Sequence, residues 1–230
     1  MRNICFTIYS STKDDDKYIA LNNYRTLLEI LLIPAIQDKI NREKKVQKIM
    51  LDLFPDLEND KVEYFRELFY GKKPYDGIVN ISISTKGIDW NSLSEYERKD
   101  FLIEKWKVLF NNLSEDYFVT DKSEVIASLD ELKNKDWKIT SSPFKRKVKY
   151  NKENYSVVLD ITTERAQLAL VRDSDNKQFV LRNFETAQIH TDANFKGFQL
   201  DGDTLTFVYK NAFNTMFGSP VAFNLREIFN

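Results

Sequence analysis

The stretch of residues 144–152 has residue types and a spacing that suit binding. In FKRKVKYNK, basic residues alternate with aromatic, apolar and further basic ones: Lys145, Lys147 and Lys149 against Phe144, Arg146, Val148 and Tyr150. On a β-strand, this alternation places the three lysines on one face and two aromatic rings with an arginine on the other. The segment is therefore the main candidate binding site of the chain.

Three interpretations of this strand stay open. The lysines can protect an edge strand from pairing with another chain. The strand can form a protein interface, where Tyr and Arg are favoured anchors. It can also follow a phosphate backbone while an aromatic residue stacks on a base. For each functional reading the candidate residues are the same: Lys145, Arg146, Lys147, Lys149 and Tyr150.

Residues for nucleophilic catalysis are scarce. His190 is the sole histidine and Cys5 the sole cysteine, and no G-x-S-x-G motif presents a serine. Asp192 is too close to His190 in sequence to orient it as the acid of a triad. A Cys5–His190 pair would require two strand ends to converge, and we expect His190 to lie in a loop. We predict no catalytic residue.

Metal and cofactor motifs are also incomplete. Residues 173–176, DSDN, match the start of a calcium loop, but Gln178 replaces the glycine and Phe184 the closing acid. A turn in which Asp and Asn bond their own backbone explains this segment better. With six glycines and neither a G-x-G-x-x-G nor a P-loop motif, we expect no cofactor and no metal site.

Charge and hydropathy limit the partner classes. The 230 residues carry 34 basic and 35 acidic side chains, so the molecule as a whole has no attraction for nucleic acid or anionic membranes. Local patches are still allowed. No apolar run reaches the roughly 18–20 residues that span a bilayer. We predict a cytoplasmic protein.

The N-terminal part has mostly helical periodicity. We expect helices over 20–31, on through 36–53, over 62–69, from Ser94 and from Asp121. Ser94 has capping-box spacing to Glu97, with Ser92 and Glu95 as a competing box. Pro34 either kinks the first helix or starts the next. Strands are expected at 4–9 and 77–84, and a short one at 116–120.

The pattern changes to period 2 in the C-terminal part. Strands are expected over 155–161, 166–171, 178–184, 195–200 and 203–209, the last two joined through Asp201-Gly202, and a final strand within 221–229. The sequence predicts an α+β protein: a helix-rich part (1–136) with two or three strands, then an antiparallel β-meander, sheet or small barrel (137–230).

Two functions follow as hypotheses. The first is a non-catalytic intracellular module that binds another protein, such as an inhibitor or a toxin-neutralising immunity-type protein. The second is a nucleic-acid-binding protein, or a carboxylate-dependent enzyme acting on nucleic acid, that uses Asp160 and Glu164 beside the basic strand. The near-zero net charge favours the first.

Overall fold

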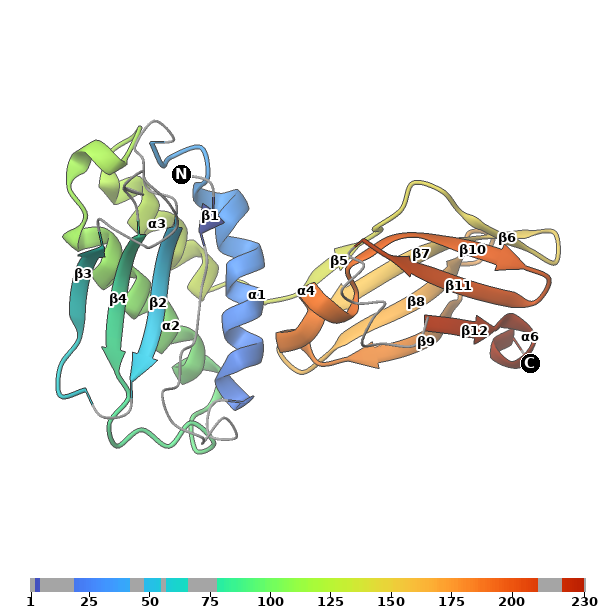
Figure 1. The fold of residues 1–230 in the computed structure, drawn as a ribbon, viewed down its shortest axis with the longest axis horizontal. Helices are drawn as coiled ribbons and strands as arrows, with labels where there is room; N and C mark the ends of the chain where they lie inside the picture. Colours follow the sequence, from blue (N-terminus) through green and yellow to red (C-terminus); the bar gives the residue numbers. More distant parts are fainter. Residues whose placement is uncertain are drawn as a thin grey trace, which may run out of the picture. The chain divides into compact units, whose positions relative to one another are not determined.

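A computed structural model describes residues 3–4, 19–41, 48–54, 57–65, 78–210 and 221–229. The chain divides into two compact units, Met1–Trp137 and Lys138–Asn230. The first combines helices with a mixed sheet and the second is built from antiparallel strands (Figure 1). The predicted α+β class is confirmed.

The sheet of the helix-rich unit has four described strands in the order β1-β2-β4-β3. They are β1 (Asn3–Ile4), β2 (Lys48–Phe54), β3 (Lys61–Phe65) and β4 (Ile78–Ser84). β2 is parallel to both β1 and β4, whereas β3 is antiparallel to β4. The expected strand over 77–84 is therefore confirmed, and β2 holds a central place in the sheet.

Three helices pack with this sheet: α1 (Ile19–Ile36), α2 (Glu95–Asn112) and α3 (Lys122–Lys133). Their apolar stripes are fully buried at Leu28, Trp106 and Leu129, as expected for a core. Pro34 lies inside α1, so this helix continues for two residues beyond the proline. A short 3₁₀ helix, η2 (Glu115–Tyr117), connects α2 to α3.

Two expected helices are wrong. The apolar stripe over 36–53 ends in strand β2, and the segment from Val62 to Phe65 lies in strand β3. Strand β2 has neighbours on both sides, and such strands are often apolar almost throughout, so their sequence lacks the period-2 alternation that distinguishes a strand from a helix. Strand β3 lies at the edge of the described sheet, and the spacing of Val62 and Phe65 fits a helix as well as a strand. The segment 116–120 is not a strand either, although Phe118 forms an isolated bridge with Ile40.

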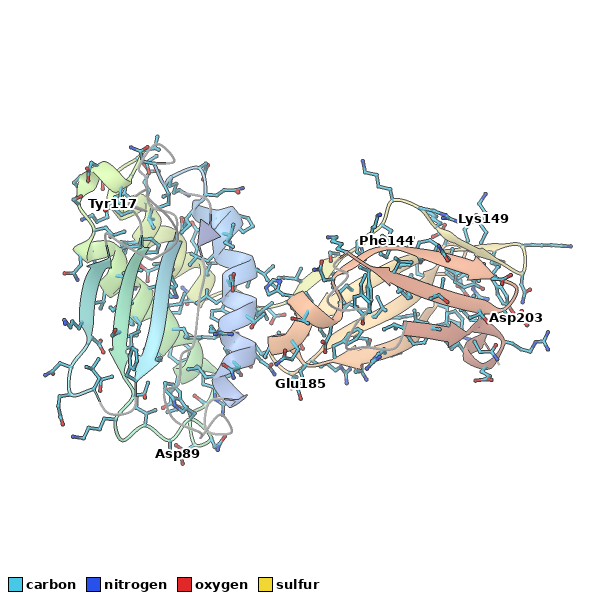
Figure 2. The ribbon with its side chains drawn as sticks, viewed as in Figure 1. Asp89, Tyr117, Phe144, Lys149, Glu185 and Asp203 are labelled. Atoms are coloured by element: carbon cyan, nitrogen blue, oxygen red, sulfur yellow. The ribbon has the colours of Figure 1, made fainter. Side chains whose placement is uncertain are left out.

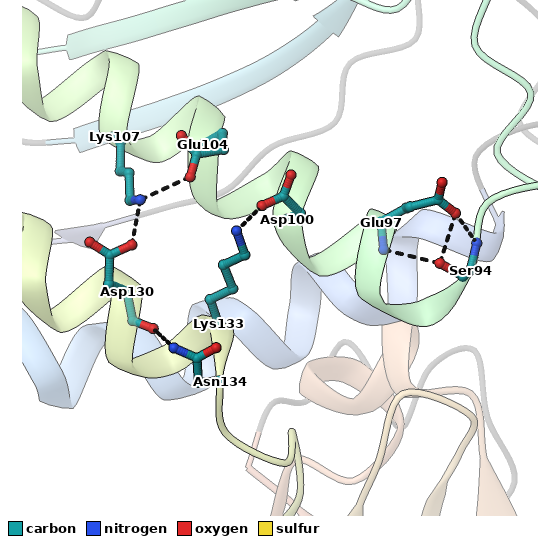
Figure 3. A network of polar contacts seen from close by, with 8 residues as sticks. All are labelled: Ser94, Glu97, Asp100, Glu104, Lys107, Asp130, Lys133 and Asn134. Atoms are coloured by element: carbon teal, nitrogen blue, oxygen red, sulfur yellow. Dashed lines mark hydrogen bonds and ion pairs between the residues drawn. The ribbon is translucent and has the colours of Figure 1, made fainter.

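Helix ends and helix faces in this unit are held by polar side chains (Figure 3). Ser94 and Glu97 form the predicted capping box, in which the Ser94 hydroxyl accepts from the Glu97 amide and the Glu97 carboxylate accepts from the Ser94 amide. Asp121 caps α3 by accepting from the amide of Ser123. These bonds satisfy amide groups that have no partner inside the helix.

The β-rich unit contains two antiparallel sheets (Figure 1). The five-stranded sheet is formed by β5 (Ile139–Ser141), β6 (Val148–Tyr150), β7 (Glu153–Ile161), β8 (Ala166–Arg172) and β9 (Gln178–Phe184). The three-stranded sheet is formed by β10 (Phe195–Asp201), β11 (Thr204–Tyr209) and β12 (Val221–Asn224). The predicted meander strands are confirmed.

Short helices complete this unit: η3 (Thr186–Gln188), α4 (Ile189–Asp192) and α6 (Leu225–Phe229). The expected strand in 221–229 is therefore correct only up to Asn224, where the chain turns into α6. Residue His190 lies in α4 and is exposed, not in a loop.

Turn chemistry sets the register of the strands. Asp201 pairs with Thr204, so the β10–β11 turn consists of Gly202 and Asp203, one residue later than expected. Gly202 has φ of +54°, which a glycine adopts without steric cost. The β6–β7 turn uses Asn151 and Lys152, both with positive φ, as a two-residue hairpin of type I′ requires.

Candidate functional site

The predicted site residues lie on an excursion of the chain and on the strand that follows it. Strands β5 and β6 both pair with the same edge of β7, β5 with residues 159–161 and β6 with residues 153–155. Residues 142–147 lead from one to the other outside any strand. The prediction of a continuous strand over 144–150 is therefore wrong for 144–147 and correct for Val148 to Tyr150.

The excursion is held by aromatic contacts with the three-stranded sheet. The Phe144 ring lies 5.5 Å from Phe198 and 6.2 Å from Phe207, measured between ring centroids. The Arg146 guanidinium lies 5.1 Å from the centroid of the same Phe198 ring, at cation–π distance. Pro143, which has no amide hydrogen to donate to a strand ladder, precedes this contact. The contacts of Phe144 and Arg146 therefore hold the basic segment against the three-stranded sheet.

The four cations of the site are used differently. Lys147 forms an ion pair with Asp173 at 2.5 Å, and Ser156 also donates to this carboxylate. Hydrogen bonding by Lys147 lowers the pKa of Asp173. Lys145 and Lys149 are exposed, and neither forms an ion pair with a described residue. The net positive charge of the segment therefore comes mainly from Lys145, Arg146 and Lys149.

Tyr150 points into the unit, toward the β10–β11 turn. Its hydroxyl donates to Asp203 Oδ1 at 2.7 Å, and its ring lies 5.5 Å from Phe229. The hydrogen bond to the Asp203 carboxylate is the main cause that raises the pKa of Tyr150. Figure 2 labels Lys149 on β6 and Asp203 at the turn. Tyr150 therefore anchors β6. Its ring packs against Phe229 within the same unit and is not free to stack on a ligand.

The other candidate chemistry does not assemble among the described residues. Asp160 accepts from Thr140 on the neighbouring strand, and Glu164 lies in the β7–β8 turn. Asp175 bonds the amide of Lys177 and pairs with Arg172, as expected for turn chemistry. The described part of the chain holds no group of three or more His, Cys, Asp or Glu that could bind a metal. Cys5 lies outside it.

Sequence reasoning missed the outward face of the five-stranded sheet. Register places Gln167 opposite Asn183, and the Gln167 amide donates to Asn183 and accepts from Gln178. Between these amides lie Ala169, which is fully buried, and its partner Val180, which is 47% exposed. Alternation alone identifies each strand, but not which positions face one another across strands, so the sequence carried no direct signal for this group.

The helix-rich unit has an open hollow of about 360 Å³ along α2. Its lining includes the apolar Ile88, Leu93 and Phe101 and the acids Asp100 and Glu104. These acids are paired with Lys133 and Lys107 (Figure 3). The third acid of the lining, Glu97, accepts hydrogen bonds from Ser94, and Lys105 is paired with Asp60, so the hollow offers little unpaired charge to a ligand.

Comparison of the chain with protein-family models, curated proteins and solved structures found no match. Within the described residues, no helix is both long enough and apolar enough to cross a membrane. The candidate site must therefore be judged on its own geometry.

Proposed function

We propose that this chain is a non-catalytic protein-binding module whose basic segment, residues 144–150, contacts an acidic surface of a partner protein. One observation carries the proposal: Lys145 and Lys149 are exposed and form no ion pair with a described residue, while the backbone beneath them is anchored by Phe144, Arg146 and Tyr150. A fixed group of unpaired charges steers an oppositely charged partner and costs little ordering entropy on binding.

The distribution of charge between the two units supports a cationic role for the β-rich unit. Residues 138–230 contain 13 basic and 10 acidic side chains, whereas residues 1–137 contain 21 and 25. The whole chain is nearly neutral because these opposite imbalances cancel. A positive binding surface on the β-rich unit is therefore compatible with a net charge of −1.

The nucleic-acid alternative receives less support from the same contacts. A single-strand binder needs accessible aromatic faces beside its cations. Here Phe144 packs on Phe198 and Phe207, and Tyr150 lies against Phe229. Lys147, one of the cations that would follow the phosphates, is paired with Asp173. An inhibitor or immunity-type role, in the cytoplasm, is the narrower form of the protein-binding proposal.

The experiment compares three forms of the full chain as bait in a lysate of the source organism. These are the wild type, K145E/K149E, and the matched control K196E/K210E, which reverses two other exposed lysines of the same unit. We expect one stoichiometric protein to be recovered and identified with the wild type and the control, and to be lost with K145E/K149E. Equal recovery by all three forms would overturn the proposal.

Retention on columns of heparin and of DNA at low salt distinguishes nucleic-acid binding from protein binding. We expect the wild type and K145E/K149E to differ on these columns no more than they differ on immobilised poly-L-glutamate, because exposed lysines are attracted to any polyanion. A loss of retention in K145E/K149E that is clearly larger on DNA than on poly-L-glutamate, and that is absent in K196E/K210E, would favour nucleic acid, because phosphate contacts depend strongly on salt and on lysine charge.

A further inference from the structure

Helix α6 depends on contacts with the rest of the β-rich unit. It has only five residues, Leu225–Phe229, and a helix of this length is not stable by itself in water. Leu225 is fully buried, and its amide donates to the carbonyl of Asp203 at 2.8 Å. Its folding is therefore a docking equilibrium set by the surface it rests on.

Phe229, the last described residue of α6, lies in a cluster of three rings. Its centroid is 4.7 Å from Tyr155, in a stacked arrangement, and 4.6 Å from Phe179, edge-on. The third ring, at 5.5 Å, is that of Tyr150 on β6. Aromatic pairs at such separations stabilise a fold beyond the area they bury. α6 thus contacts β6 directly.

Asp203 provides a second link between β6 and α6. It lies in the β10–β11 turn, accepts from the Tyr150 hydroxyl with Oδ1, and pairs with Arg226 of α6 through Oδ2 at 3.1 Å. Its carbonyl is also the acceptor for Leu225. One residue therefore holds the end of β6 and the start of α6.

Strand β6 has few other attachments. It pairs with β7 over only three residues, and of its side chains Val148 and Tyr150 point inward while Lys149 is exposed. Tyr150 thus supplies one of two inward anchors, and its contacts with Asp203 and Phe229 belong to the α6 docking site. Strand β5 lies on the same edge of β7, but none of its described contacts is with α6 or Asp203.

We propose that Asp203 and Phe229 couple the docking of α6 to the position of β6, so that α6 regulates how Lys149 is presented to a partner. Asp203 is a positioning residue in this arrangement. The regulatory role rests on the proposed function, whereas the coupling itself is a property of the fold and is measured without a partner.

Hydrogen exchange of the full chain tests the coupling. In Phe229→Ala, we expect exchange of amides 148–150 to rise about tenfold relative to amides 139–141 of β5, because each 1.4 kcal/mol of lost local stability raises opening tenfold. In Tyr150→Phe, which keeps the ring and removes the hydroxyl, we expect a rise of about threefold to tenfold. Taking the ratio of β6 to β5 exchange corrects for global destabilisation, which would raise exchange in both strands.

Phe223→Ala is the matched control. Phe223 is half-buried like Phe229 and lies on β12, where its ring contacts Phe207 at 6.0 Å. We expect this substitution to leave the ratio of β6 to β5 exchange unchanged. The inference is overturned if Phe229→Ala frees the amides of α6 while the β6 to β5 ratio stays at the wild-type value, or if Phe223→Ala changes that ratio equally.

Retention on immobilised poly-L-glutamate, as a model acidic surface, separates the two proposals. We expect Phe229→Ala and K145E/K149E to elute at lower salt than the wild type and Phe223→Ala. Unchanged elution of Phe229→Ala with reduced retention of K145E/K149E would refute regulation by α6 and leave the basic segment as the binding site. Unchanged elution of K145E/K149E would refute the basic segment itself, whatever the exchange data show.

Discussion

The helix pair α2–α3 and the basic segment of the β-rich unit differ in how their lysines are paired. In the helix-rich unit, lysines of α2 and α3 pair with acids on the same or the facing helix, as Lys107 does with Glu104 and Asp130, and Lys133 with Asp100 (Figure 3). In the β-rich unit, Lys145 and Lys149 form no ion pair with a described residue. Ion pairs thus link the helices of the first unit, whereas the basic segment of the second unit has two exposed lysines outside any ion pair with a described residue.

The two units also differ in what holds their elements together. The α2–α3 pair combines a buried apolar stripe with helix caps and an ion-pair network. The β-rich unit relies on aromatic rings: Phe144 of the excursion contacts Phe207 of β11, and Phe195 and Phe207 lie 4.9 Å apart within the three-stranded sheet. Substitutions of helix caps or ion pairs should therefore destabilise the helix-rich unit, and substitutions of aromatic rings should destabilise the β-rich unit.

The largest expected effect comes from a core ring. Phe207 is 1% exposed and contacts several other rings of the β-rich unit. Phe207→Ala should lower the free energy of unfolding of this unit by about 3–5 kcal/mol, through lost burial and a cavity. Denaturant titration with probes in each unit measures it. A loss below about 1 kcal/mol would contradict a packed aromatic core.

The next effect concerns the cap of α2. Ser94→Ala should destabilise the helix-rich unit by about 1 kcal/mol, because the Glu97 amide loses the hydroxyl oxygen that accepts its hydrogen bond. Ser92→Ala is the control, since Ser92 precedes the cap and its hydroxyl bonds only the Asp89 carbonyl. Thermal unfolding of both variants measures the difference. Equal losses would show that the box at Ser94 and Glu97 is not the effective cap.

A smaller effect is expected from the helix–helix ion pairs. Asp130→Asn should cost about 0.2–1 kcal/mol at low salt, and less as salt rises from about 0.1 M to about 1 M. Burial alone lowers the pKa of Lys107, but its hydrogen bonds to Asp130 and Glu104 outweigh this and raise it. Its stabilisation is therefore present below the ordinary lysine pKa and lost as pH rises through the raised value. A salt-independent cost would contradict an ionic origin.

The smallest effect is an acid dependence of the β-rich unit. A hydrogen bond from Arg172 is the main cause that lowers the pKa of Asp175 to about 2. The stabilisation is therefore present above the unfolded-state pKa of about 3.9 and is lost as pH falls toward about 2. Asp175→Asn should flatten the pH dependence of the melting temperature in this range, while Asp201→Asn serves as the control. An unchanged slope in Asp175→Asn would refute the assignment.

The sequence predicted the β-rich unit better than the helix-rich one, for a physical reason. Strands β7, β8 and β11 have one inward face, so alternation reveals them, and Gly202 marks the turn between β10 and β11. The central strand β2 is apolar almost throughout, and such a run also fits a buried helix.

The sequence predicted which residues form the candidate site, but it did not predict the residues that they contact. Alternation correctly put Val148 and Tyr150 on the face opposite Lys149, and the structure shows that their face is the inward one. The partners of this segment are distant in sequence: Tyr150 bonds Asp203, 53 residues later, and Phe144 packs on Phe198. Such pairs arise when two sheets face each other, and no local pattern encodes them.

Affinity for the identified and purified partner tests the central claim most directly. It should be measured at low salt for the wild type, K145E/K149E and K196E/K210E. We predict that K145E/K149E binds at least about tenfold more weakly, which is about 1.4 kcal/mol, and that K196E/K210E binds like the wild type. Equal affinity of the three forms, or an equal loss in both variants, would contradict the assignment of the basic segment as the binding site.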